Sequence, residues 1–244
     1  MKKKRIIILS CISLALIAIA LGCAIYLGDY YRADDESIAA FIADYDVKSE
    51  NIGGITVFGT GEEKYGFIFY PGGKVEADSY IPLMCALADM DVFSVICEMP
   101  FNLAVLDVNA ANGIREMYPD IKDWYIGGHS LGGSMAAEYL KNNIDGYKGL
   151  VLLGSYSMAD LSGGEARVLS LFGSEDKIMN REKYNKYRSN LPESLIEAEL
   201  DGACHAYFGM YGEQNGDGVP TMECEKQIII TANSIKEFIL RGEV

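Results

Sequence analysis

A serine surrounded by glycines stands out in the stretch WYIGGHSLGG, residues 124–133. A β-branched and aromatic run precedes it, helix-forming residues follow it, and its centre is the G-x-S-x-G sequence of Gly128, His129, Ser130, Leu131 and Gly132. Between a strand and a helix, this sequence is typical of a sharp turn that exposes a nucleophilic serine. The flanking glycines leave room for the turn, and the Leu131 N–H would point at the substrate oxygen. A phosphate-binding loop would instead end in Gly-Lys-Ser/Thr, which this stretch does not.

A serine hydroxyl is a poor nucleophile and needs a base within hydrogen-bond reach. The chain has only two histidines. His129 adjoins Ser130, so its side chain leaves the turn in another direction. His205 lies in GACHAYFG, directly after the apolar run SLIEAEL, where a loop would follow a strand. We therefore predict that His205 is the base and that His129 packs within the turn.

The base needs an acid that fixes its tautomer and orientation. The apolar run VLSLFG is followed by Glu175 and Asp176. We select Asp176 as the acid and interpret Glu175 as its solvated neighbour. The order Ser130, Asp176, His205 is one of the known chain orders of a serine triad.

The elements that must position these residues alternate along the chain. Continuous apolar runs predict strands near residues 54–60, 65–73, 91–100, 123–128, 149–155, 166–174 and 194–200. Apolar residues at helical spacing predict helices near residues 79–90, 103–119, 130–143, 180–191 and 222–240. Strands that are apolar throughout indicate a mostly parallel sheet with helices on both faces, an α/β fold. Reactive groups in such a sheet lie beyond the carboxyl ends of the strands.

From about Tyr65 to the C-terminus the chain resembles a compact α/β-hydrolase, similar to the small esterase and dienelactone-hydrolase-like branch of that superfamily. The segments FIFYPGG, GGHSLGG, FGSED and GACHAYFG carry the resemblance. It implies an α/β-hydrolase fold and hydrolysis of an ester or similar acyl bond through an acyl-enzyme. YPGGK occupies the place of a His-Gly-Gly segment in related enzymes, which implies the Gly73 N–H as second oxyanion donor, with Lys74 next in line. Dienelactone hydrolases use a cysteine nucleophile, so their substrate does not follow for this chain.

The first 28 residues differ in character from the rest. MKKKR precedes 22 uncharged residues, Ile6 to Leu27, which as a helix would span roughly 33 Å against a hydrocarbon core of about 30 Å. The basic cluster predicts a cytoplasmic N-terminus and an exported domain. We expect an uncleaved anchor over 1–28, a linker with a short helix over 29–50, and the α/β-hydrolase domain over 51–244. A cleaved signal peptide and a lipoprotein acylated at Cys23 are the alternatives, and all three export the domain.

Charge restricts the partners of the exported part. Four of the 21 basic residues and none of the 35 acidic ones precede Asp29, so the remainder carries 17 basic and 35 acidic residues, a formal charge of −18. Nucleic acid and anionic lipid surfaces would be repelled. The expected partners are a small-molecule ester substrate and, through the N-terminal helix, the membrane. A membrane-tethered protein that recruits cationic partners is a further alternative.

Several smaller features complete the expectation. No metal or cofactor is expected, because no CxxC spacing occurs and the calcium-like segment EQNGDGVPTMECE loses its register at Cys224. Cys204 and Cys224 could form a disulfide, or remain thiols.

Glu98 and Asn102 could line the pocket or simply pack at the surface. The segment between the predicted strands 149–155 and 166–174 is too short for a helical lid, so we expect an open, shallow pocket. An acyltransferase, a peptidase or a non-catalytic binding domain could use the same scaffold.

Overall fold

The computed structural model describes residues 2–243 of the chain, in two units that divide after Tyr30. The first unit contains the helix α1 (Lys2–Gly28). Its stretch Ser10–Gly28 has a mean hydropathy of 2.4 and is long and apolar enough to cross a membrane, features that an N-terminal signal sequence would share. The second unit, from Tyr31 onward, holds the residues singled out for chemistry.

Within the described residues the second unit contains one eight-stranded sheet in the order β1-β2-β4-β3-β5-β6-β7-β8. β1 pairs with β2 and β2 with β4 in antiparallel fashion, and all the other pairs are parallel. The strands are β1 (Ser49–Asn51), β2 (Ile55–Phe58), β3 (Tyr65–Tyr70), β4 (Val92–Cys97), β5 (Asp123–His129), β6 (Gly149–Leu153), β7 (Arg167–Gly173) and β8 (Ile196–Leu200). The predicted mostly parallel sheet is therefore confirmed, with an antiparallel extension at one edge.

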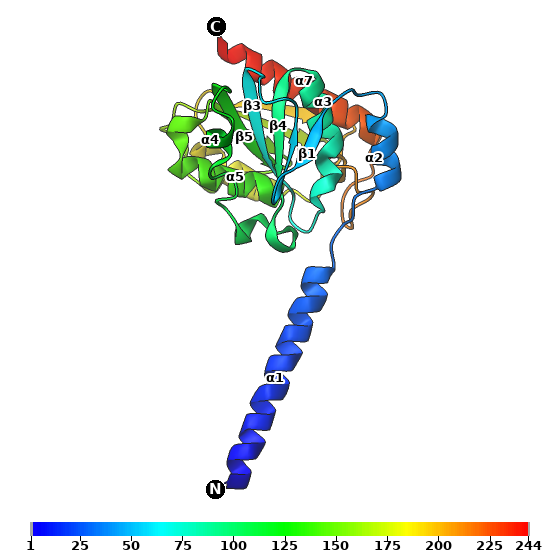
Figure 1. The fold of residues 1–244 in the computed structure, drawn as a ribbon, viewed down its shortest axis with the longest axis vertical. Helices are drawn as coiled ribbons and strands as arrows, with labels where there is room; N and C mark the ends of the chain where they lie inside the picture. Colours follow the sequence, from blue (N-terminus) through cyan, green and yellow to red (C-terminus); the bar gives the residue numbers. More distant parts are fainter. Residues whose placement is uncertain (1, 244) are drawn as a thin grey trace. The chain divides into compact units, whose positions relative to one another are not determined.

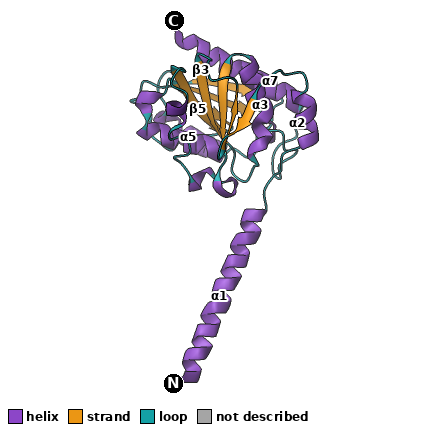
Figure 2. Ribbon diagram, in the orientation of Figure 1, coloured by secondary structure: helices purple, strands orange, loops and turns teal. Residues whose placement is uncertain are grey.

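Helices cover both faces of this sheet, as Figures 1 and 2 show. α3 (Ile81–Asp89) and α7 (Cys224–Leu240) pack against each other on one face, and α2 (Asp35–Ile42) packs on α3. α5 (Leu131–Asn142) covers the other face. Two shorter helices, α4 (Ile114–Met117) and α6 (Arg181–Tyr187), complete the set.

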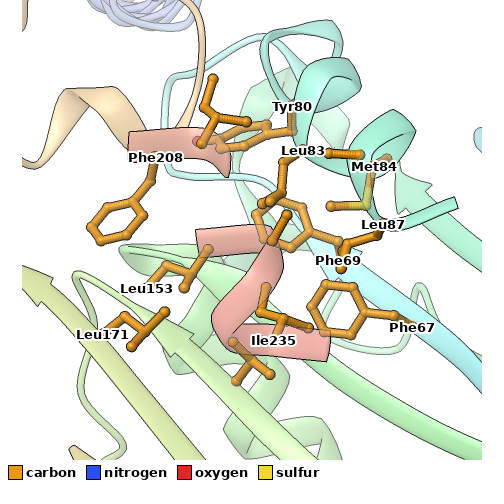
Figure 3. Close-up of a cluster of buried hydrophobic side chains, with 14 of the residues drawn as sticks. Phe67, Phe69, Tyr80, Leu83, Met84, Leu87, Leu153, Leu171, Phe208 and Ile235 are labelled. Carbon is orange, nitrogen blue, oxygen red and sulfur yellow. The ribbon is translucent and has the colours of Figure 1, made fainter. Parts of the chain in front are cut away.

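The strand β3 shows how the sequence builds a core on each face. Successive side chains of a strand point to opposite faces. Phe67 and Phe69 belong to the cluster that includes α3 and α7 (Figure 3), whereas Ile68 and Tyr70 belong to the cluster that includes α5. All four side chains are fully buried. A strand buried on both faces reads as the continuous apolar run seen in the sequence.

One predicted helix is wrong. Residues 103–119 form turns, one short 3-10 segment (Ala104–Leu106) and only the four-residue α4, and another 3-10 segment, Pro100–Asn102, precedes them. Gly113 adopts φ +80° just before α4, a conformation that ends any helix approaching it. The Tyr70 hydroxyl donates to the Val108 carbonyl oxygen (2.8 Å) and accepts from the Ala111 N–H (2.9 Å). A buried side chain thus satisfies main-chain groups that a helix would otherwise pair.

The segment expected as a linker is part of the compact second unit from Tyr31 onward. The predicted short helix is present as α2, with Ile38 buried, and β1 extends the sheet. Tyr31 forms a parallel β-bridge with Val75. The Tyr31 N–H donates to the Lys74 carbonyl oxygen (2.8 Å), and the Tyr31 carbonyl oxygen accepts from the Glu76 N–H (2.9 Å). These hydrogen bonds fix the start of the domain beside the loop that follows β3.

Candidate active site

Ser130 lies at the turn between β5 and α5, in a backbone conformation that residues other than glycine rarely adopt. Its φ is +53° and its ψ is −120°. Such a conformation costs of order 1–3 kcal/mol and persists only where the surroundings hold it. Here the Ser130 N–H donates to the Leu153 carbonyl oxygen (2.9 Å), and the Ser130 carbonyl accepts from the Ser155 hydroxyl (2.7 Å). The main chain of Ser130 is therefore fixed from both sides by residues at the end of β6.

The two flanking glycines are required by close main-chain contacts. A Cβ atom on Gly128 would lie 2.5 Å from the Tyr70 carbonyl oxygen, and one on Gly132 would lie 2.1 Å from the same atom. Both distances are shorter than real Cβ contacts allow. The sharp strand–helix turn predicted from the G-x-S-x-G sequence is therefore present, and it packs directly against the end of β3.

His205 and Asp176 meet at the same edge of the sheet, after β8 and β7. His205 Nδ1 lies 2.8 Å from Asp176 Oδ2, and the two residues are 1% and 5% exposed. The second carboxylate oxygen, Oδ1, accepts from the N–H groups of Ile178 (2.9 Å) and Met179 (2.8 Å). The carboxylate is therefore held by three hydrogen bonds, which fixes its direction towards His205. Glu175 is half-buried, and the His205 ring meets Asp176 rather than Glu175.

Gly154 connects this pair to the serine turn. It follows Leu153, whose carbonyl oxygen accepts from the Ser130 N–H, and its own φ is +51°. A Cβ atom at this position would lie 2.8 Å from His205 Nδ1 and 3.1 Å from Asp176 Oδ2. The main chain after β6 thus touches both the serine turn and the histidine–carboxylate pair. The Ser130 hydroxyl itself makes no hydrogen bond within the described part of the chain.

Two N–H groups beside Ser130 are available to an oxygen atom. In the loop after β3 the Gly72 N–H donates to the Tyr80 hydroxyl (3.1 Å) and the Lys74 N–H to the Asn102 carbonyl (2.7 Å). The N–H groups of Gly73 and Leu131 have no acceptor among residues 2–243. A Cβ atom on Gly73 would lie 2.9 Å from Leu131 Cδ2, so these two residues are neighbours. Lys74, the second choice from the sequence, has its N–H engaged.

His129 belongs to a buried contact that sequence reasoning missed. Its Nδ1 lies 2.8 Å from the Tyr80 hydroxyl, and its ring centroid lies 4.4 Å from that of His205. Tyr80 is fully buried, and its ring centroid lies 4.8 Å from that of Phe69 (Figure 3). The Tyr80 hydroxyl also accepts from the Gly72 N–H (3.1 Å), so Tyr80 joins His129 to the loop after β3. Only the place of Tyr80 one residue before α3 could have signalled this contact, and that signal is weak.

Burial lowers the pKa of His129 well below 6.5, and the neighbouring His205 lowers it further. A main-chain contact with His205 opposes these effects only in part. His129 is therefore neutral near pH 7. A neutral ring can lie against His205 without repelling a proton that His205 accepts.

The two cysteines near the candidate site, Cys204 and Cys224, are thiols that are not poised as nucleophiles. Cys204 and Cys224 are free, so the disulfide considered from the sequence is absent from the described residues. Burial raises the pKa of each to about 12. A thiol with so high a pKa carries almost no thiolate at neutral pH. Cys204, although next to His205 in the chain, therefore does not compete with Ser130.

The remaining candidates from the sequence have structural partners. The Glu98 side chain is exposed and accepts from the Asn51 amide (2.7 Å), and Asn102 contributes its main-chain oxygen to Lys74. The described residues contain no group of three or more histidine, cysteine, aspartate or glutamate side chains placed to hold a metal. In the calcium-like segment EQNGDGVPTMECE, the Asp217 carboxylate accepts hydrogen bonds from main-chain N–H groups.

A pocket of about 510 Å³ lies at the opposite end of the strands, where β5 and β7 begin. Asp123, Lys148 and Arg167 are among its lining residues. Lys148 and Asp123 approach to 3.9 Å, and Arg167 donates to the Phe238 carbonyl oxygen (2.8 Å). These charges neutralise one another or hold α7, and no nucleophile with a base lies among the lining residues. The carboxyl edge, with Ser130, His205 and Asp176, is the better candidate for chemistry.

Comparison with known proteins gives a family match that covers the candidate site. The family model described as the alpha/beta hydrolase family matches residues 66–229, more than half of the chain. No curated protein sequence matches the chain. The match ends within α7 and includes the serine turn and the loops that carry Asp176 and His205.

Solved structures with the same fold include the following two. A predicted CIB-like hydrolase from Thermoplasma acidophilum has a TM-score of 0.57 and 14% identity, over 79% of this chain and 99% of that chain. Est1E from Butyrivibrio proteoclasticus has a TM-score of 0.56 and 14% identity, over 80% of this chain and 98% of that chain. At such identities the likeness shows the fold.

Proposed function

We propose that this chain, which belongs to the alpha/beta hydrolase family, is a serine hydrolase that cleaves a carboxylic ester through a covalent acyl-enzyme. Family membership supports hydrolase activity in general. The observation that carries the finer proposal is the buried contact between His205 Nδ1 and Asp176 Oδ2, together with a strained serine at the same sheet edge. The Asp176 carboxylate is held in place by two main-chain N–H groups as well as by His205, an arrangement that is typical of a catalytic base and its acid and not of a histidine at the surface.

In the first step Ser130 Oγ attacks the carbonyl carbon of the ester while His205 Nε2 accepts the hydroxyl proton. Asp176, bonded to Nδ1, holds the ring so that Nε2 is the basic nitrogen, and it stabilises the positive charge that the ring acquires. The tetrahedral intermediate carries its negative charge on the former carbonyl oxygen. The free N–H groups of Gly73 and Leu131 are the donors for that oxygen.

Collapse of the intermediate breaks the ester bond, and the proton on His205 passes to the departing alcohol. Water then takes the place of Ser130 as nucleophile: His205 removes its proton, a second tetrahedral intermediate forms, and the acid leaves as Ser130 regains its proton. The neutral His129 ring beside His205 supports this cycle, since a second positive charge there would oppose protonation of the base.

The substrate we propose is a small ester that reaches the site from solvent. Residues 154–166, between β6 and β7, contain no helix within the described structure, which supports an open site without a helical lid there. An acyltransferase and a peptidase pass through the same intermediates, and they differ in the group that accepts or leaves the acyl carbon. We expect water as the acceptor and an alcohol as the leaving group.

A labelling experiment separates the hydrolase from a non-catalytic binding domain. The full chain should react with a fluorophosphonate at Ser130 and hydrolyse short-chain aryl esters. Ser130→Ala should abolish both, whereas Ser162→Ala, in an exposed turn held by Asp160, should change neither. Turnover by Ser130→Ala at the wild-type rate, or no labelling of the wild type, would overturn the proposal.

We further infer that α1 anchors the chain in a membrane and that the domain lies on its extracytoplasmic side. The length and apolar composition of Ser10–Gly28 and the basic residues before it support this topology. Protease added to intact cells or spheroplasts should then digest the domain. A freely soluble exported product with a new N-terminus near residue 24 would instead show cleavage of a signal sequence.

A further inference from the structure

Asp217 makes an unusual set of contacts in the loop between His205 and α7. Its Oδ1 accepts from the Lys177 N–H (3.2 Å) and from its own neighbour, the Gly218 N–H (2.8 Å). Its Oδ2 accepts from the Ala206 N–H (2.9 Å). One half-buried carboxylate therefore joins the main chains of two loops that are far apart in the sequence.

Two of the three partners of Asp217 are the residues that follow the proposed acid and base. Lys177 follows Asp176, and Ala206 follows His205. On the other side of the pair the Glu175 N–H donates to the Ala203 carbonyl oxygen (2.9 Å). The acid loop and the base loop are thus joined both before and after the His205–Asp176 contact, and Asp217 supplies the second junction.

The neighbouring glycine shows that this junction is tightly packed. A Cβ atom on Gly218 would lie 2.0 Å from the Glu175 carbonyl oxygen. The loop that carries Asp217 therefore approaches the main chain of the acid loop as closely as a glycine permits. No other residue type fits there without moving one of the two loops.

The same loop is held at its outer side by the first residues of the domain. The Asn215 N–H donates to the Tyr31 hydroxyl (3.1 Å), the Tyr31 and Tyr211 rings lie 5.6 Å apart, and the Asp34 N–H donates to the Met210 carbonyl (3.0 Å). Asp217 is consequently part of an ordered loop, fixed between the N-terminal segment and the two catalytic loops.

We propose that Asp217 is a positioning residue, which clasps the acid loop to the base loop and so sets the geometry of the His205–Asp176 pair. The inference rests on the proposed serine hydrolase function and adds to it a residue outside the triad. Without the clasp the residues after Asp176 and His205 would be free to separate, while the junction at Glu175 would persist. Displacement of about 1 Å in such a group can cost on the order of 100-fold in rate.

The chemistry of the clasp makes asparagine the informative substitution. Asparagine has the same size, but only one of its two terminal atoms accepts a hydrogen bond. In Asp217→Asn the amide NH2 would face either the Lys177 or the Ala206 N–H, so one of the two loops would lose its acceptor. The matched control is Asp160→Asn, because Asp160 also accepts a main-chain and a hydroxyl hydrogen bond but only from Ser162 in its own exposed turn.

The test measures turnover of a short-chain aryl ester per active site of the full chain, with sites counted by fluorophosphonate labelling of Ser130. We expect Asp217→Asn to lower kcat per labelled site by about 10- to 100-fold with a small change in KM, and Asp160→Asn to match the wild type. Asp217→Glu, which keeps two acceptor oxygens, should recover part of the loss.

A purely structural role would reduce the fraction of protein that can be labelled and leave the turnover per labelled site unchanged, so that outcome would overturn the proposal. If Asp217→Asn yields too little labelled protein, Asp217→Ser decides by the same measure, because its single hydroxyl cannot replace both carboxylate oxygens: turnover per labelled site equal to that of Asp160→Asn contradicts the clasp. Failure of the serine hydrolase function is distinguishable, since it would appear as an absence of Ser130 labelling in the wild type.

Discussion

Substitution of Gly154 by alanine tests the geometry of the site through a residue that carries no functional group. Ordinary van der Waals contact begins near 3.4 Å, and the new Cβ would lie 2.8 Å from His205 Nδ1, 3.0 Å from His205 Cε1 and 3.1 Å from Asp176 Oδ2. The ring or the main chain must therefore move by about 0.6 Å. That movement would displace His205 Nδ1 or Asp176 Oδ2, the two atoms whose contact we propose to activate Ser130.

The variant also places an alanine at φ +51°, and this backbone strain needs a control of its own. Gly113 has φ +80°, and a Cβ atom there would meet nothing within 4 Å. Left-handed conformations cost residues other than glycine roughly 1–2 kcal/mol. Gly154→Ala and Gly113→Ala should therefore share that loss of stability, and the difference between them isolates the collision with His205 and Asp176.

We expect Gly154→Ala to lower kcat for a short-chain aryl ester by on the order of 100-fold, and Gly113→Ala to leave kcat near the wild-type value. The thermal unfolding of both variants is also measured, and kcat is determined at a temperature at which both variants are folded. Equal kcat values for the two variants would refute the reasoning, because the His205–Asp176 contact could then be displaced without consequence.

The other predictions concern the acid, the buried histidine and the buried thiol. Asp176→Asn should preserve the fold and cut turnover on the order of 10⁴-fold, measured as kcat at neutral pH; a larger loss from Glu175→Gln would move the assignment by one residue. His129→Gln should keep much of the rate. Because the folded state holds the pKa of His129 well below 6.5, the unfolded chain binds more protons below pH 6.5, so wild-type stability should fall with acidification from pH 6.5 to 5.5. The fall in melting temperature should be smaller in His129→Gln, and equal slopes would argue against a neutral His129. Cys204→Ala should retain turnover per folded molecule, since a thiol with a pKa of about 12 contributes no nucleophile; loss of fluorophosphonate labelling in this variant would contradict that.

The sequence predicted the parts of the fold in which periodicity and burial agree. Strands β3 to β7 are each visible as apolar runs, because a central parallel strand must be apolar on both faces. The antiparallel β1 was missed, since Ser49, Glu50 and Asn51 are exposed and carry no such pattern. The helix expected over 103–119 does not form, because main-chain groups in this segment pair with the Tyr70 hydroxyl instead of with one another. Tyr70 lies 38 residues before Val108 in the chain. A side chain so distant in sequence leaves no trace in local spacing.

The site was predictable where chain order and elimination suffice. Two histidines and one strand–turn–helix serine left few choices for Ser130 and His205, and Asp176 rather than Glu175 meets the histidine ring in the structure. The roles of Gly154 and Asp217 depend on how separate loops meet after folding. Nothing in their neighbouring residues reveals those contacts, and the segment around Asp217 reads from the sequence only as a turn.

The central claim is that Ser130 forms the acyl-enzyme with His205 as its base, and trapping that intermediate tests it most directly. Full-length protein is mixed with a short-chain aryl ester, quenched with acid, and mapped by peptide mass spectrometry. We predict an acyl adduct on Ser130 in the wild type and none in Ser130→Ala. Formation should be slowed in His205→Ala about as much as turnover falls in Ser130→Ala and in the double variant, because members of one catalytic unit fail together. An adduct on any other residue, or full activity of His205→Ala, would contradict the mechanism.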